Sequence, residues 1–279
     1  MKNLFLKGIK VLKEEGVQQF SKKLLRFVGT RISEKLSILA GIILEKVTFR
    51  KPRENQRFEP VVSVLLTSYN RPRMLQEAIE SVLDQTYQNF ELIILDDNSN
   101  EETLKIIQQY LKNPKVRFYK SAVKDEDRWK EARYAVLINE GLKIAKGELI
   151  TYLCDDDYFL PHRLEKMVKF LEEHPSIKVC YGRQRMIPGN QIRRPDRVLR
   201  SPGFQVDHSS VMHYKSCIDE VGNWDTNNVG AADAVFWNKL GAKFPFYPIR
   251  EILDVHCYHS ESISSKMGKG EHLKWKREK

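Results

Sequence analysis

The chain has 279 residues, of which 41% are hydrophobic and 30% are charged, and its formal net charge is +10. Most of that charge lies in residues 1–57, which hold 14 Lys or Arg and 5 Glu and so carry +9, leaving +1 for the other 222 residues. This composition predicts one sizeable folded domain with a basic appendage, and the near-neutral domain argues against nucleic-acid binding.

Residues 1–57 are predicted to form a basic, amphipathic helical arm that ends in a linker. Lys and Arg surround a helix face made by Ile32, Leu36, Leu39, Ile43 and Val47. Such an arm can lie on an anionic membrane surface, or it can pack against its own domain or a protein partner, and the sequence leaves these alternatives open. Its longest apolar run is too short to span a bilayer, and the N-terminus lacks signal-peptide features.

The cysteines are far apart and form no CxxC pair: Cys154, Cys180, Cys217 and Cys257. This spacing predicts neither a zinc site nor a disulfide framework, and it fits a reducing compartment. We therefore expect a cytoplasmic protein, with residues 1–57 offering a peripheral contact to the inner face of the membrane. The Lys-rich residues 266–279 are expected to form a basic tail.

From Val61 onward, predicted strands and helices alternate. Strands are expected at 61–67, 90–95, 116–119, 148–153 and 178–181. Helices are expected at 72–85, 102–111, 131–145 and 161–174. This βαβ alternation predicts an α/β fold whose sheet is mostly parallel, with helices on both faces. Residues 58–265 are assigned to this domain, and the Pro-, Gly- and aromatic-rich part after Gly182 is expected to build the second half of a cleft.

Polar clusters follow three of these strands, namely Thr67-Ser68-Tyr69-Asn70, Asp96-Asp97-Asn98 and Asp155-Asp156-Asp157. Parallel strands end at a common edge of the sheet, where open α/β sheets bind ligands, so the clusters can converge. A nucleobase can stack on Tyr69 and hydrogen-bond to Asp97. The alternative is that the Asn residues only form turns or helix caps.

The triplet Asp155-Asp156-Asp157 is the most informative of the three clusters. Adjacent carboxylates repel one another unless a cation neutralises them. Hard oxygen ligands suit Mn²⁺ or Mg²⁺, which bind through one or two carboxylates plus substrate phosphates. The alternative is a solvated acidic turn that caps the next helix. The chain has neither G-x-G-x-x-G nor G-x-x-x-x-G-K-[ST], so dinucleotide and P-loop sites lose their main support.

Several runs of this sequence resemble the family-2 glycosyltransferases of GT-A fold. The general runs are VSVLLTSYN (62–70), SVLDQT (81–86) and residues 91–99 with their two Asp. Four further runs resemble the spore-coat polysaccharide and spore-maturation branch of that family: LDDNSNEETL (95–104), ARYAVLIN (132–139), FQVDHSSVMH (204–213) and DAVFW (233–237). The resemblance covers roughly residues 60–256, and the basic arm falls outside it.

The resemblance implies a metal-dependent enzyme that transfers a sugar, with inversion, from a nucleotide-diphosphate donor. The donor is expected to be a UDP- or dTDP-sugar, and the acceptor a hydroxyl of a saccharide, such as a surface or spore polysaccharide. A nucleotide-binding half at about 60–182 and an acceptor-binding half at about 183–265 are implied as well. The alternative is a nucleotide-sugar-binding protein without transferase activity, and only a turnover assay distinguishes the two.

The resemblance also assigns roles to individual residues by their positions in the matched runs. The residues expected to bind the nucleotide are Thr67, Tyr69, Asp97 and Arg128 at the base and Asp155 at the ribose. Asp156 is expected to bind the Mn²⁺ or Mg²⁺ that bridges the pyrophosphate. Asp157 stands where this branch can carry Asn, so the choice of metal ligand between Asp156 and Asp157 stays open.

Two further assignments concern the second half of the domain. His259 begins a run that resembles the family's H-x-x-S-x-S tail, whose His can complete the metal shell, and a structural role for His259 is the alternative. Asp233 matches the catalytic base, while Ala232 stands where many members carry a second acid. The sequence alone favours a helix N-cap for Asp233, and only the resemblance favours the catalytic base.

Overall fold

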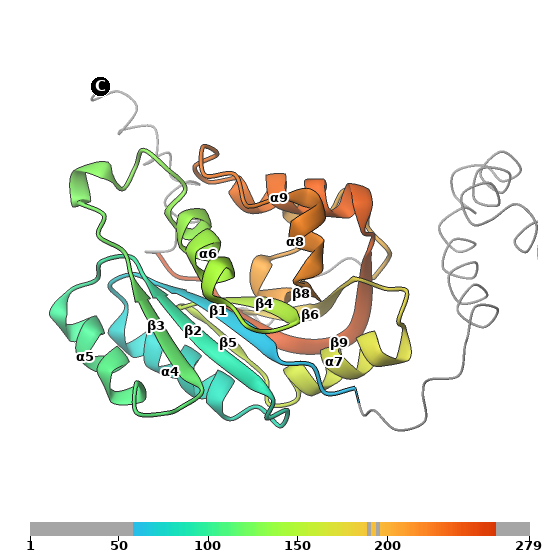
Figure 1. Ribbon diagram of the computed structural model, residues 1–279, viewed down its shortest axis with the longest axis horizontal. Helices are drawn as coiled ribbons and strands as arrows, with labels where there is room; N and C mark the ends of the chain where they lie inside the picture. Colours follow the sequence, from blue (N-terminus) through green and yellow to red (C-terminus); the bar gives the residue numbers. More distant parts are fainter. Residues whose placement is uncertain (1–57, 189–190, 194–195, 261–279) are drawn as a thin grey trace, which may run out of the picture. The chain divides into compact units, whose positions relative to one another are not determined.

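The computed structural model describes residues 58–188, 191–193 and 196–260 (Figure 1). The predicted arm at 1–57 and the predicted tail at 266–279 lie outside the described residues. Among the residues that are described, no helix has both the length and the apolar composition that crossing a membrane would require.

The described residues form one nine-stranded sheet in the order β3-β2-β1-β4-β8-β6-β9-β5, with β7 paired to β6. The strands are β1 (Val62–Ser68), β2 (Phe90–Asp96), β3 (Val116–Lys120), β4 (Leu149–Cys154), β5 (Asp157–Phe159), β6 (Val179–Ile187), β7 (Gln191–Arg193), β8 (Val211–Tyr214) and β9 (Phe246–Cys257). The α-helices are α4 (Pro72–Leu83), α5 (Glu101–Tyr110), α6 (Arg133–Ile144), α7 (Arg163–Glu173), α8 (Ser216–Val221) and α9 (Ala232–Lys243). Short 3₁₀ turns are η1 (Asp125–Asp127), η2 (Gly203–Gln205) and η3 (His208–Ser210).

The sheet is parallel in its first half and mixed in its second. Strands β3, β2, β1 and β4 run parallel, as the βαβ pattern predicts. Beyond β4, strand β8 is antiparallel to both β4 and β6, whereas β9 is parallel to β6 and antiparallel to β5. The predicted α/β fold is thus confirmed, and the antiparallel pairings all lie beyond β4 in the sheet.

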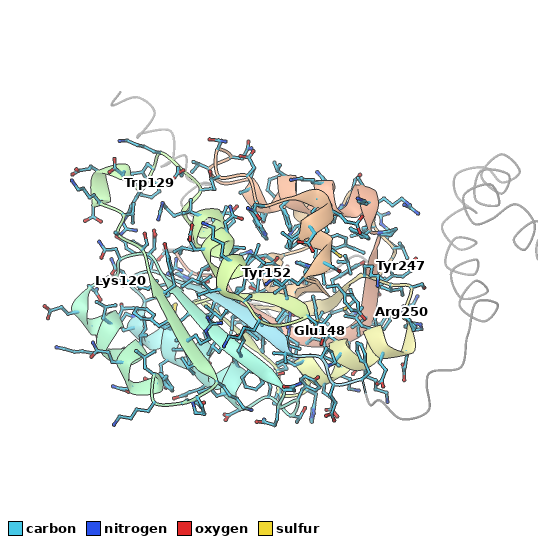
Figure 2. The ribbon with its side chains drawn as sticks, viewed as in Figure 1. Lys120, Trp129, Glu148, Tyr152, Tyr247 and Arg250 are labelled. Atoms are coloured by element: carbon cyan, nitrogen blue, oxygen red, sulfur yellow. The ribbon has the colours of Figure 1, made fainter. Side chains whose placement is uncertain are left out.

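Helices cover both faces of the sheet because successive side chains of each strand point to opposite sides. On β1, Val64 packs in a core with α4, α5 and α7, whereas its neighbour Leu65 packs in a second core with α6 and α9. Figure 1 shows α6, α8 and α9 on the same side of the sheet. Figure 2 shows Tyr152 of β4 in the middle of the packed side chains.

The strand register brings the three polar clusters to one edge of the sheet. On β1, Thr67 pairs with Leu95 of β2 and with Cys154 of β4, so all three strands end at the same level. The backbone N–H of Asp155 donates to the carbonyl of Thr67 at 3.1 Å, and the N–H of Asp97 donates to the carbonyl of Ser68 at 2.9 Å. One residue of each acidic cluster, Asp97 and Asp155, is therefore tied to the end of β1.

His213 of β8 is a buried titratable group whose protonation is coupled to folding. Its Nδ1 donates to the carbonyl of Tyr214 at 2.8 Å, and its Nε2 accepts from the hydroxyl of Tyr152 at 2.7 Å. Burial lowers the pKa of His213 to about 4. In the unfolded chain, His is protonated below about pH 6.5, whereas the buried His213 stays neutral down to about pH 4. The free energy of unfolding is therefore highest above about pH 6.5 and decreases as the pH falls toward 4, because the proton binds only to the unfolded chain.

We expect this histidine to make unfolding depend on pH. Between pH 7.5 and pH 5, its protonation in the unfolded chain should remove about 2 kcal/mol of the free energy of unfolding. Urea denaturation of the wild type and of His213→Gln at both pH values measures the difference. The variant should be less stable at pH 7.5 and should lose less stability at pH 5, and equal losses in both proteins would contradict the assignment.

Candidate active site

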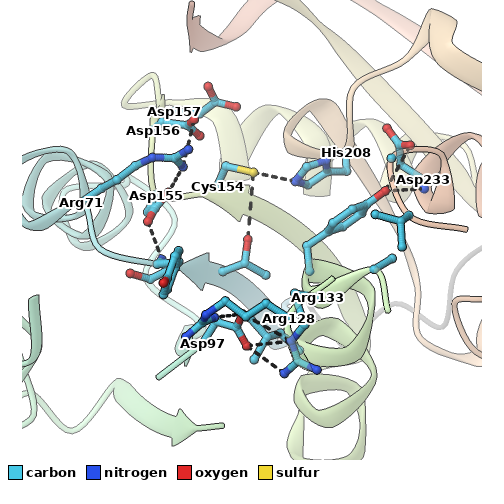
Figure 3. A pocket seen from close by; sticks show the side chains of 18 of the residues that line it. Arg71, Asp97, Arg128, Arg133, Cys154, Asp155, Asp156, Asp157, His208 and Asp233 are labelled. Carbon is cyan, nitrogen blue, oxygen red and sulfur yellow. Dashed lines mark hydrogen bonds and ion pairs between the residues drawn. The ribbon is translucent and has the colours of Figure 1, made fainter. Parts of the chain in front are cut away.

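A cavity of about 560 Å³ lies at the edge where β1, β2 and β4 end. Residues from both halves of the domain line it. The first half contributes the strand-end residues and the start of α6, and the second half contributes Phe204, Val206, Asp207, His208, Val229, Gly230, Asp233 and His256. Figure 3 shows Asp97, Asp155 and Asp233 around this space, each coming from a different element. Of the predicted site residues, only His259 is outside the cavity lining, and it contacts Asp156.

Asp97 is held at one end of the cavity by two arginines. Nη1 of Arg128 donates to Oδ2 of Asp97 at 2.5 Å, and Nη2 of Arg133 donates to Oδ1 at 2.8 Å. The guanidinium of Arg128 also covers the ring of Tyr69, 3.8 Å from its centroid. The structure therefore brings together three of the residues predicted to bind a base and adds Arg133, to which the sequence interpretation gave no role.

The asparagines next to these residues have a conformational role. Asn70 and Asn98 adopt positive φ angles of 53° and 61°, a region that Asn tolerates better than most residues. Oδ1 of Asn70 accepts from the backbone N–H of Asn100 at 2.7 Å, and Nδ2 of Asn98 donates to the carbonyl of Val123 at 3.0 Å. Both side chains thus shape the loops that follow β1 and β2, which was the alternative left open by the sequence.

Arg71 provides the positive charge nearest to the first two carboxylates of the triplet. Its Nη1 lies 2.7 Å from Oδ1 of Asp155 and 3.1 Å from Oδ2 of Asp156. Oδ2 of Asp155 accepts from the backbone N–H of Tyr69 at 2.8 Å. Burial and the neighbouring Asp156 raise the pKa of Asp155 to about 6, although Arg71 acts in the opposite direction. The guanidinium of Arg71 therefore supplies the positive charge between these two carboxylates.

Asp157 is engaged by the protein on both of its carboxylate oxygens. Oδ2 accepts from the hydroxyl of Ser209 at 2.8 Å, and Oδ1 accepts from the N–H of Cys257 at 3.2 Å. Nδ1 of His256 lies 3.0 Å from Oδ1. Burial opposes the charge of His256, but its hydrogen bond and attraction to Asp157 raise the pKa of His256 to about 9. Asp157 therefore ties β5 to β9.

The residues around Asp156 fit a divalent cation. Oδ2 of Asp156 lies 3.0 Å from Nε2 of His259, so a carboxylate and an imidazole converge at the same point. Such oxygen and nitrogen ligands suit Mn²⁺. Potential ligand atoms of Cys154, Asp156 and Asp157 also lie within 4.8 Å of one another. However, burial raises the pKa of Cys154 well above its usual range, and a protonated thiol is a poor ligand.

Asp233 lies on the opposite side of the cavity, in the first turn of α9. Ala231 occupies the N-cap position of this helix and makes no side-chain cap hydrogen bond, so Asp233 is not the N-cap. Its Oδ1 accepts from the N–H of Ala234 at 2.8 Å. Burial raises the pKa of Asp233, and this effect is opposed by His208 and by hydrogen bonds from Ala234 and Tyr134. The result is a carboxylate at the cavity wall whose proton affinity is higher than usual.

Five residues line the cavity to which the sequence interpretation assigned no role in binding the nucleotide or the metal or in proton transfer. They are Arg71, Arg133, Tyr134, Cys154 and His208. Partial signals were present, because Arg71 directly follows the first strand-end cluster and Arg133-Tyr134 lies in the ARYAVLIN run. The contacts of these residues join segments up to 99 positions apart in the chain, such as Tyr134 and Asp233. Spacing along the sequence does not reveal such pairs.

Comparisons with known proteins identify the family and the fold of the chain. Residues 63–230 match the family model for glycosyl transferase family 2. In sequence, the chain is similar to Protein CgeD of Bacillus subtilis (strain 168), with 41% identity over 208 residues, which is 69% of this chain and 49% of CgeD. The chain therefore spans about half the length of this curated relative.

Two solved structures share the fold. S. aureus TarS 1–349 in complex with UDP-GlcNAc has a TM-score of 0.61 at 17% identity, covering 72% of this chain and 59% of TarS 1–349. Mannosyltransferase PcManGT from Pyrobaculum calidifontis, in complex with GDP-Man and Mn²⁺, has a TM-score of 0.60 at 15% identity, covering 87% of this chain and 72% of that one. The predicted family and the predicted GT-A fold are both confirmed. The chain belongs to glycosyl transferase family 2.

Proposed function

We propose that this chain transfers a sugar from a nucleotide-diphosphate sugar to a hydroxyl of a saccharide acceptor, with a divalent cation and with inversion. One observation carries the proposal: a single cavity is lined by the Asp97 cluster, the acidic triplet and Asp233. Its volume of about 560 Å³ lies within the range of about 300–1,000 Å³ that is usual for small-molecule sites.

The end of the cavity around Asp97 is assigned to the nucleobase. Carboxylate oxygens fixed by Arg128 and Arg133 can accept a hydrogen bond from an N–H of the base. The ring of Tyr69 carries the Arg128 guanidinium on one face and is 38% exposed, so it can offer an aromatic surface beside them. Thr67 also lines the cavity and is assigned to the base, and Asp155, another lining residue, is assigned to the ribose hydroxyls. UDP-GlcNAc in TarS and GDP-Man in PcManGT support a nucleotide-sugar donor and leave the base open.

The centre of the cavity is assigned to the diphosphate and its cation. Asp156 and His259 would hold the metal, and Asp157 would support this group through β5 and β9. The bound cation would stabilise the negative charge that develops on the leaving nucleoside diphosphate. The Mn²⁺ in the PcManGT complex supports Mn²⁺ or Mg²⁺. Arg71, which contacts both Asp155 and Asp156, is assigned as a second positive charge for the phosphates.

Asp233 is assigned as the general base for the acceptor. It takes the proton of the attacking hydroxyl as the bond from the acceptor oxygen to the anomeric carbon forms and the bond from that carbon to the diphosphate oxygen breaks. Attack opposite the leaving group inverts the anomeric carbon. A base works best when its pKa approaches the working pH, and burial shifts the pKa of Asp233 in that direction.

The acceptor is assigned to the side of the cavity formed by the second half of the domain. Phe204, Val206 and Val229 give this side an apolar character, which suits the carbon face of a sugar ring. The resemblance of four sequence runs to the spore-coat polysaccharide branch supports a surface or spore polysaccharide as the acceptor.

Thermal denaturation with a panel of UDP-, dTDP- and GDP-sugars tests the binding half of this proposal. The matching donor should raise the melting temperature with Mn²⁺ and much less with EDTA. A ligand at about 100 times its Kd adds about 2.7 kcal/mol to the free energy of unfolding. No stabilisation by any nucleotide sugar with Mn²⁺ or Mg²⁺ would contradict the proposal.

A further inference from the structure

Tyr134, the second residue of α6, contacts Asp233, the second residue of α9. The Tyr134 hydroxyl accepts from the backbone N–H of Asp233 at 3.1 Å, and its oxygen lies 3.4 Å from Oδ1 of the same residue. Because the backbone N–H occupies a lone pair of the hydroxyl, its proton is left to point toward the carboxylate. A single hydroxyl therefore engages both the main chain and the side chain of Asp233.

The ring of His208 packs against the ring of Tyr134. The two rings are stacked, with their centroids 6.0 Å apart and an angle of 14° between their planes. Nε2 of His208 lies 2.9 Å from Sγ of Cys154, the last residue of β4. Trp224 also packs against the Tyr134 ring in an edge-on arrangement, with the ring centroids 6.3 Å apart. Figure 3 shows His208 between Cys154 and the Asp233 side of the cavity.

These contacts connect the end of a core strand to the side chain assigned as the base. The ring of Tyr134 is fixed by His208 and Trp224, and its hydroxyl in turn fixes the first turn of α9 at Asp233. The 3.4 Å separation is long for an O–H···O bond, and such bonds in ligand-free sites often shorten when substrate binds. We propose that Tyr134 is a positioning residue that holds Asp233 for proton abstraction through its hydroxyl, with His208 fixing its ring.

The proposal rests on the proposed function, because it takes Asp233 as the base. The titratable groups that act on Asp233 are Tyr134 of α6, His208 of η3 and Asp207, which precedes η3. Burial raises the pKa of Asp233, Asp207 adds to this, and His208 and Tyr134 act against it. Removing the Tyr134 hydroxyl should therefore raise the pKa of Asp233 further and move the acid limb of kcat/KM to higher pH.

Tyr134→Phe tests this proposal, because it keeps the ring and its packing and removes only the hydroxyl. We expect kcat for transfer to fall about tenfold, the size of one hydrogen bond to a charged group. The donor Kd should be unchanged, and the acid limb should move to higher pH. Tyr87→Phe is a matched control, since the hydroxyl of Tyr87 bonds to the carbonyl of Pro60 at 2.7 Å and Tyr87 does not line the cavity.

A second comparison separates positioning from packing. In an Asp233→Asn background, Tyr134→Phe should cause no further loss of the residual transfer, because the hydroxyl acts through the carboxylate. A loss that adds to that of Asp233→Asn would overturn the proposal, as would a Tyr134→Phe enzyme with wild-type kcat and acid limb. If Asp233→Asn itself transfers normally, the assigned base is wrong and the proposed mechanism fails with it. If Asp233→Asn loses transfer but Tyr134→Phe keeps the wild-type kcat and acid limb, Asp233 remains the assigned base and the positioning role of Tyr134 is wrong.

Discussion

Asp233→Asn is expected to reduce sugar transfer by about 10²-fold or more, which is the usual contribution of a general base. Asn has the same shape as Asp and can still accept the N–H of Ala234, so α9 and the donor site should remain intact. Steady-state transfer, together with donor binding by calorimetry, separates the two effects. Donor affinity should stay within about twofold of the wild-type value, because Asp233 lies on the acceptor side of the cavity.

Asp225→Asn is the control for this variant. Asp225 lies eight positions earlier, does not line the cavity, and bonds to the N–H of Asn227 and to the side chain of Asn228. Its loss should leave transfer unchanged. Near-normal transfer by Asp233→Asn would place the base elsewhere, with Asp207 as the next candidate because it also lines the cavity. Loss of donor binding would mean that Asp233 has a structural role.

Asp156→Ala is expected to reduce nucleotide affinity in the presence of Mn²⁺ to the value measured in EDTA. The variant removes the carboxylate on which Arg71 and His259 converge, and it leaves the contact between Arg71 and Asp155 in place. Calorimetry with UDP or dTDP, with and without Mn²⁺, gives the two affinities. If the metal still strengthens nucleotide binding to the same extent, Asp156 is not the ligand.

Asp157→Asn is the informative partner of that experiment. The carboxylate of Asp157 already accepts from Ser209 and Cys257 and pairs with His256. We therefore expect this variant to lose stability, since it weakens the pair with His256 between β5 and β9, and to keep its response to Mn²⁺. The opposite result would be that Mn²⁺ no longer strengthens nucleotide binding to Asp157→Asn but still strengthens it in Asp156→Ala. Asp157 would then be the metal ligand and Asp156 the structural residue.

The first half of the fold could be predicted from the sequence because its signals are local. The alternation of apolar strands and amphipathic helices from Val62 to Glu173 sets the boundaries of the expected elements to within about two residues, and the carboxyl ends of parallel strands locate the site. The short strand β5 was not predicted, and β6 continues to Ile187, beyond its expected end at 181. The apolar residues of α4, for example, recur at helical spacing and are buried. The same reasoning predicts that Tyr69, Asp97 and Asp155 share one site, and all three line the cavity.

The second half could not be predicted in this way. Strand β9 contains Pro248 and the adjacent charges Arg250 and Glu251, so it shows no regular alternation, and its place is set by pairing with β6 and β5. Strand β8 has only four residues and joins β4 to β6 by antiparallel pairing. These elements depend on contacts between distant segments, and Asp157 acquires its partners, Ser209 and His256, only when β9 and η3 are in place.

The roles of individual site residues show the same division. Motif positions placed Asp97 at the base end, but its two arginine partners come from a loop and from the start of α6. The sequence left the role of Asp233 open between helix cap and base. The structure excludes the N-cap position, because Ala231 caps α9, and it puts the carboxylate in the cavity wall. The catalytic role of Asp233 stays a prediction that the variants above address.

Release of nucleoside diphosphate from a panel of nucleotide sugars, measured with saccharide acceptors and with either Mn²⁺ or EDTA, tests the proposed metal-dependent sugar transfer. We expect that one donor class is turned over, that EDTA stops the release, and that NMR of the product shows the inverted anomer. Binding of a nucleotide sugar with Mn²⁺ but without release or transfer from any donor would contradict it, and the chain would then be a nucleotide-sugar-binding protein.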